Sequence, residues 1–259
     1  MIHFSVDDFI LNFADLTAQK DRYPSIFNQP VFSFFQRMHE EYGAVFSLYC
    51  FGKDLKSGFL LEDVTRDYRK EFEENASWLK FGFHAMDSEA VYGDNRGTRT
   101  INRDADQALD DYQYVMHQLS EIVGEKAIDT VPRIHFFAGT SACCMAWKNA
   151  YHGVTGLIAA DDNRISYDHS DKQHECLVRE NVIYDEEKEL YFWRTNIRLE
   201  NEKEEEILRQ KIRSFQGKCQ IVFTHECYLN EVEMQKKIEL CAREAKKVGN
   251  PSEFPMNCI

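Results

Sequence analysis

Short apolar segments alternate along the chain with longer segments in which apolar residues recur every three or four positions. The short segments are rich in β-branched and aromatic residues, and several are apolar on both faces, which is typical of strands buried in a parallel sheet. They predict seven strands, at residues 2–6, 44–51, 78–83, 133–137, 156–160, 191–194 and 220–224.

The longer segments have the period of amphipathic helices. They predict helices at residues 31–42, 63–76, 108–123, 141–151 and 230–247, and a Glu- and Lys-rich helix just before the last strand. Gly43 is expected to end the first of these helices. The polar, Gly-containing residues 85–103 predict a loop that shapes a pocket. Strands that alternate with helices indicate an α/β fold with a parallel sheet, open or closed into a barrel.

Composition narrows the class of protein. A chain of 259 residues with 43% apolar residues and no Gly/Ser-rich linker suits one large α/β domain, which we expect to span residues 1–259. The net charge of −13 argues against a nucleic-acid partner. The sequence contains no apolar run long enough to span a membrane and no export signal. The eight cysteines, which lack zinc-ribbon spacing, are therefore expected to be free thiols in a reducing cytoplasm.

Polar side chains gather where the predicted strands end. Asp7 and Asp8 close the first strand, His84 the third, and His225 with Glu226 the seventh. His135 lies in the fourth predicted strand, and Asp161–Asp162 follow the fifth. Because the loops at the strand ends of parallel α/β folds build the binding pocket, these groups are expected to converge on one cavity.

Each of these residues also has a purely structural interpretation. Asp7 and Asp8 would make ordinary caps for a following helix. His84 would serve equally as a hydrogen-bonded loop histidine, and His135 as a buried core residue. The expected convergence of several such groups, more than any single residue, favours a functional site.

These positions resemble the motifs of the polysaccharide deacetylase (NodB-homology) family. Residues 4–8 (Phe-Ser-Val-Asp-Asp) resemble its opening Thr-Phe-Asp-Asp, and residues 81–84 (Phe-Gly-Phe-His) resemble its Gly-Asn-His. Residues 134–139 stand where the family has Phe-Arg-Pro-Pro-Tyr-Gly, and residues 222–226 resemble its closing Leu-x-His-Asp. The resemblance spans nearly the whole chain and implies an irregular (β/α)7-type barrel of mainly parallel strands.

The resemblance also implies roles for individual residues. Asp7 would be the catalytic base, His225 the general acid, and Asp8 and His84 ligands of a divalent metal, expected to be zinc. Two departures accompany these matches: Ser88 stands where the family has a second metal-binding histidine, and His135 appears to replace the arginine of the third motif. A catalytic zinc normally has three protein ligands. His135, Asp87 and Asp94 are the candidates for the third.

The function implied is a metal-dependent hydrolase that removes acyl groups from an N- or O-acylated carbohydrate, with His135, Asp162 and Glu226 as substrate-binding residues. Glu226 or Glu200 would stand near His225 and raise its pKa. Two alternatives remain open: a carbohydrate-binding protein without turnover, or a glycoside hydrolase that pairs Asp7 with Asp162. The sequence leaves the substrate and the oligomeric state undetermined.

Overall fold

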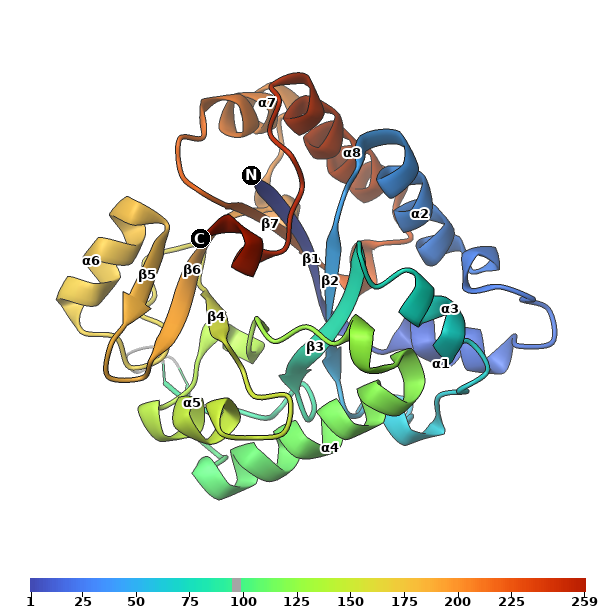
Figure 1. Cartoon of the computed structure of the whole chain (residues 1–259), viewed down its shortest axis with the longest axis horizontal. Helices are drawn as coiled ribbons and strands as arrows, with labels where there is room; N and C mark the ends of the chain where they lie inside the picture. The colour runs from blue at the N-terminus through green and yellow to red at the C-terminus, as the bar shows by residue number, and fades with distance from the viewer. Residues whose placement is uncertain (95–98) are drawn as a thin grey trace.

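The computed structural model describes residues 1–94 and 99–259, which form a curled parallel sheet surrounded by helices (Figure 1). The sheet order is β3-β2-β1-β7-β6-β4, every neighbouring pair along this path is parallel, and β5 pairs with β6 in the antiparallel sense. The strands are β1 (Ile2–Phe9), β2 (Phe46–Phe51), β3 (Leu79–Ala85), β4 (Gly156–Ala159), β5 (Val182–Asp185), β6 (Leu190–Arg198) and β7 (Gln220–His225). The predicted α/β barrel-type fold of mainly parallel strands is confirmed.

The helices pack on the outside of the sheet (Figure 1). They are α1 (Leu11–Ala18), α2 (Pro30–Tyr42), α3 (Arg69–Glu74), α4 (Ala105–Val123), α5 (Ser141–Lys148), α6 (Asp171–Glu180), α7 (Glu205–Ser214) and α8 (Val232–Lys247). Gly43 ends α2 as predicted, and its φ of 73° explains why a residue without a Cβ stands there. None of the helices in the described ranges is both long and apolar enough to cross a bilayer.

Phenylalanine rings fill much of the space between the sheet and the helices. Phe13 of α1 stacks on Phe81 of β3 with ring centroids 5.4 Å apart, and Phe72 of α3 meets Phe81 edge-on at 5.1 Å. Such pairs add attraction to that of the area they bury. Because α1 and α3 are short, these aromatic contacts fix them against the sheet that carries the site.

The predicted strand at residues 133–137 is wrong. Residues 135–137 form a single 3₁₀ turn in which Phe136 and Phe137 have positive φ values of 59° and 58°. The preceding residues 128–133 run between the two edge strands instead. Asp129 donates its N–H to Phe81 of β3, and on the other side Ile158 of β4 donates to the carbonyl of Pro132.

The segment of residues 128–133 therefore bridges β3 and β4 without being a regular strand. Pro132 has no N–H to donate, which prevents a continuous ladder. The bridge is completed by the N–H of Thr155, which donates to Thr130, and by the hydroxyl of Tyr49, which donates to Val131. We call residues 128–133 the closing segment, because they connect the open edges of the curled sheet.

Three further elements were not predicted from the sequence: α1, α6 and β5. The last two lie within residues 161–190, where no period is visible. The antiparallel β5 pairs with β6 through a tight connection, and only Asp185 of its four residues is fully buried. An edge strand with few buried side chains does not require alternating apolar residues, so its hydrophobic pattern predicts a strand only weakly. All eight cysteines are free, as the sequence indicates.

Candidate active site

The end of β1 places two adjacent carboxylates in different surroundings. Asp7 continues the strand and pairs in register with His225 of β7. Asp8 has a φ of 62°, and the register of β1 with β2 shifts between Val6 and Phe9. This local bulge turns the Asp8 side chain away from the direction that strand alternation would give it. Aspartate tolerates the left-handed conformation better than most residues, so this position suits it.

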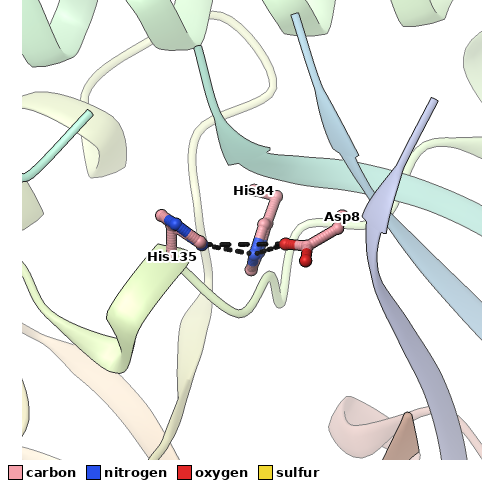
Figure 2. Close-up of side chains that lie close together, drawn as sticks. All are labelled: Asp8, His84 and His135. Atoms are coloured by element: carbon pink, nitrogen blue, oxygen red, sulfur yellow. Dashed lines mark hydrogen bonds and ion pairs between the residues drawn. The ribbon is translucent and has the colours of Figure 1, made fainter. Parts of the chain in front are cut away.

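Asp8, His84 and His135 converge on one point from three separate elements (Figure 2). Nε2 of His84 lies 3.1 Å from Oδ1 of Asp8 and 3.1 Å from Nδ1 of His135, and the latter two atoms are 3.7 Å apart. Three ligands at about 2.0–2.2 Å from a tetrahedral ion would be separated by about 3.3–3.6 Å. The observed separations are close to that geometry, and among the described residues this is the group able to hold a metal ion.

The hydrogen bonds of the two imidazoles determine which nitrogens face this point. Nδ1 of His84 lies 2.5 Å from the carbonyl oxygen of Arg133, and Nε2 of His135 lies 3.2 Å from that of Ser88. A carbonyl only accepts, so both of these nitrogens carry the proton. In the neutral imidazoles the opposite nitrogens, Nε2 of His84 and Nδ1 of His135, then present lone pairs to Asp8.

When both imidazoles are neutral, three electron-rich atoms thus face one another without a proton between them, whereas a protonated His84 donates from Nε2 to Asp8. Oδ1 of Asp8 is buried and accepts no well-aligned hydrogen bond from the described residues. Such an arrangement is repulsive unless a cation lies at its centre. Metal-binding histidines commonly donate their second N–H to a backbone carbonyl, as His84 and His135 do here. The residues therefore fit a divalent metal ion.

The electrostatics of the cluster favour the ligand forms of these side chains. Burial alone would raise the pKa of Asp8, but the contact with His84 and the neighbouring imidazoles outweigh it and hold the pKa at about 2. Burial, followed by the field of His84, lowers the pKa of His135 to about 3. At neutral pH the carboxylate is therefore ionised and the His135 imidazole is neutral.

A buried ion pair holds Asp7 beside this cluster. Nη1 of Arg133 lies 2.8 Å from Oδ1 of Asp7 and 2.8 Å from the Ser5 hydroxyl, and Nη2 lies 3.3 Å from the hydroxyl of Thr195. The Arg133 side chain is fully buried and stands 4.2 Å above the Phe223 ring. His135 was expected to stand in place of an arginine in this region; the structure shows an arginine two residues earlier, Arg133, in contact with Asp7.

His225 forms a second pair at the end of β7. Its Nδ1 lies 2.9 Å from Oε1 of Glu200, which also accepts hydrogen bonds from the backbone N–H of His225 and the hydroxyl of Thr224. Burial alone would lower the pKa of His225, but the Glu200 carboxylate, with Asp7 and Asp8, raises it above the usual value. Of the two glutamates considered from the sequence, Glu200 is the one that contacts His225.

Four of the residues described above line a cavity of about 210 Å³. Its lining comprises Asp7, His84, Arg99, Ile134, His135, Phe136, Phe137, Arg164, Arg198 and His225. The positive φ values of Phe136 and Phe137 turn the chain sharply after the closing segment and bring both rings to the wall. The cavity therefore unites Asp7, His84, His135 and His225, which the sequence suggested separately.

The sequence matches no protein-family model, and a search of curated proteins gives no match.

Two residues expected to bind substrate do not line this cavity. Glu226 is buried on the far side of the β7 end, where it accepts the backbone N–H groups of Ile10, Leu11 and Asn12 and the side-chain amide of Asn12. It therefore caps the start of α1, a role that a carboxylate at a helix N-terminus performs well. Asp162 binds the Nε of Arg164 with both carboxylate oxygens, at 2.8 and 2.9 Å.

Sequence reasoning missed Arg133 as a site residue. A charged residue between Val131 and Ile134, in a segment read as a buried strand, was the available signal. A buried guanidinium requires a carboxylate partner, and Asp7, at the end of the first strand, was a candidate.

Proposed function

We propose that this chain is a divergent relative of the polysaccharide deacetylases, a hydrolase that uses a divalent metal, zinc in our expectation, to remove acyl groups from an N- or O-acylated carbohydrate. The observation that carries the proposal is the convergence of three lone-pair-bearing atoms, from Asp8, His84 and His135, beside Asp7 and His225. Two imidazoles and one carboxylate form a ligand set that suits zinc and other first-row divalent ions.

The reaction needs an activated water, a stabilised oxyanion and a proton for the leaving group. A divalent ion held by the three ligands would lower the pKa of water and polarise the acyl carbonyl. Asp7, whose carboxylate is oriented by Arg133, would accept the proton of the attacking water. His225 would protonate the departing amine or alcohol, and its raised pKa keeps that proton available near neutral pH.

The same contacts give no support to paired-carboxylate glycoside hydrolysis. Asp162 is engaged by Arg164 and is absent from the cavity lining, so it does not face Asp7 across the site. The loss of the second family histidine at Ser88 is offset by His135, whose orientation is fixed by the Ser88 carbonyl. Because His135 supplies a third ligand, the serine at position 88 no longer favours a protein that binds sugar without turnover.

Metal binding is the first test. Untagged native protein, purified without chelator, should contain about one divalent ion per chain by elemental analysis. Asp8→Asn and His135→Gln should each reduce zinc affinity at least about 100-fold by calorimetry, since each removes a direct ligand and even outer-shell losses cost 10- to 100-fold. Asn tolerates the backbone of residue 8, so the fold should be retained. The control is His117→Gln, an exposed histidine of α4.

Turnover is the second test. Acetate release should be measured on a panel of N- and O-acetylated saccharides, with the metal-loaded native protein and with His225→Asn. A general acid contributes about 10²–10⁴-fold, so the variant should lose turnover by that factor while still binding metal. A native protein that binds no divalent ion would refute the proposal. Metal binding without turnover on any acylated sugar would point instead to a binding protein.

A further inference from the structure

Three arginines line the mouth of the cavity, although the protein as a whole carries a net charge of −13. Arg99 lies between β3 and α4, Arg164 lies between β4 and α6, and Arg198 ends β6. The convergence of three guanidinium groups from distant parts of an acidic chain is not explained by a generally basic surface.

The three arginines differ in how far their charge is already neutralised. Arg164 is paired with Asp162, and its Nη2 lies 3.5 Å from Asp161. Among the described residues Arg198 pairs with Asp161, but Nε lies 3.7 Å from Oδ2, which is too far for a hydrogen bond, and its charge also acts on Asp162. Its Nε is buried and has no hydrogen-bond partner in the described part of the chain.

Arg198 is instead held by aromatic rings. Its guanidinium carbon lies 5.0 Å from the centre of the Phe223 ring and 5.7 Å from that of Phe137. Stacking on apolar rings orients a guanidinium while leaving its N–H groups free to bind a ligand. A partly buried guanidinium whose Nε makes no hydrogen bond is costly, and an incoming oxyanion would reduce that cost.

Arg99 is placed in a similar way. Its guanidinium carbon stands 3.8 Å from the centre of the Phe136 ring, and within residues 1–94 and 99–259 no carboxylate pairs with its side chain. Arg99 and Arg198 thus provide two positive charges at the mouth of the cavity, and neither side chain is hydrogen-bonded to a carboxylate within the described residues.

We infer that the substrate carries an anionic group, a carboxylate, sulfate or phosphate on the acylated sugar, which Arg198 binds together with Arg99. The inference rests on the proposed function for the identity of the scissile group. The planar fork of a guanidinium matches the paired oxygens of such anions, and the charge-assisted hydrogen bonds are stronger than neutral ones. The two arginines would select for the anion and position the acyl group over the metal ligands.

The test is equilibrium binding by calorimetry in the His225→Asn background, which prevents turnover from distorting the measurement. The ligands are N-acetylglucosamine, its 6-sulfate and 6-phosphate, N-acetylneuraminate as a carboxylate, and inorganic sulfate. At least one anionic sugar should bind about 10- to 100-fold more tightly than N-acetylglucosamine, as expected for charge-assisted hydrogen bonds. Comparison of the three anionic sugars identifies which oxyanion is preferred.

Arg198→Gln should abolish this preference and leave the binding of the neutral sugar unchanged. Arg198→Lys should retain part of it, because the charge remains while the fork is lost. Arg99→Gln provides an independent variant, and Arg179→Gln is the control, since Arg179 is exposed and lies outside the cavity lining. Thermal melts check that each variant is folded.

Equal binding of neutral and anionic sugars, failure of all sugars to bind, or equal loss of both classes in Arg198→Gln would overturn the inference. Inorganic sulfate that binds as tightly as the sugar sulfate would also overturn it, because the site would then recognise a free anion. The measurement requires no turnover. A preference for anionic sugars without deacetylation would support the inference and refute the proposed hydrolase. Deacetylation of neutral sugars alone would support the hydrolase and refute the inference.

Discussion

The ion pair between Arg133 and Asp7 should dominate the stability of the site region. Both side chains are buried, 0% and 3% exposed, with Nη1 and Oδ1 2.8 Å apart. Replacing Arg133 by Met leaves the Asp7 carboxylate without its counter-charge. Removing one partner of a buried pair costs about 3–5 kcal/mol, because the remaining charge stays desolvated. Asp7→Asn should cost a similar amount, since it leaves the guanidinium unpaired.

The double variant should lose much less than the sum of the two single variants. With both charges gone, the remaining costs are the hydrogen bonds of Arg133 to Ser5 and Thr195, about 1 kcal/mol each, and the volume that Met fails to fill. We therefore expect a total loss of about 2–4 kcal/mol, compared with about 6–10 kcal/mol if the single effects added.

Urea unfolding at pH 7 measures these differences. With a slope of about 3 kcal/mol/M, the single variants should lower the midpoint by about 1–1.7 M. Arg37→Met, which breaks the more exposed contact with Glu239 at 3.1 Å, is the control and should change stability by at most about 1 kcal/mol. If the effects of Arg133→Met and Asp7→Asn simply added, the two charges would not be coupled and the reasoning would fail.

Three further changes test other contacts. Glu200→Gln should lower the pKa of His225 in an NMR titration and move the high-pH limb of the rate profile to lower pH. Folding raises the pKa of His225 and lowers that of Glu200, so their contact stabilises the fold most between these two pKa values. The loss in free energy of unfolding caused by Glu200→Gln should therefore be largest in that pH range and should shrink as the pH rises through the pKa of His225. A loss that does not depend on pH would contradict this. Glu226→Ala should cost about 2–4 kcal/mol in urea unfolding by freeing the first N–H groups of α1, with zinc affinity unchanged; a loss of zinc binding in the folded variant would return Glu226 to the site. Ser88→His should improve zinc affinity by less than about threefold, since His135 already supplies the third ligand; a large gain would show that His135 does not.

The periodicity of the sequence was sufficient to predict the sheet, because most strands are apolar on both faces and stand out from the amphipathic helices. It failed where an element makes few apolar contacts or irregular hydrogen bonds. The closing segment is such a case: Pro132 interrupts its ladder, and the aromatic residues that follow it, at 135–137, form a 3₁₀ turn. The strand β5 buries few of its side chains, so its sequence shows no hydrophobic alternation.

The site was partly predictable for the same reason. Asp7, Asp8, His84 and His225 all end strands that the pattern located, and parallel strands bring their ends to one side of the sheet. Orientation was beyond the sequence. Glu226 follows His225 directly, yet it points to α1 instead of the cavity. The ring of His135 is oriented toward Asp8 by a hydrogen bond to the backbone carbonyl of Ser88. Every residue has such a carbonyl, so the sequence does not indicate which one binds a histidine.

The closing segment links closure of the curled sheet to assembly of the candidate site. The stretch that covers the exposed edges of β3 and β4 also delivers the guanidinium for Asp7 and the carbonyl that sets the His84 tautomer. A molecule in which this stretch detaches would present two unpaired strand edges, which are templates for intermolecular association. The same event would release Asp7 and His84 from their partners. Activity and resistance to aggregation should therefore be lost together on mild heating, ahead of global unfolding.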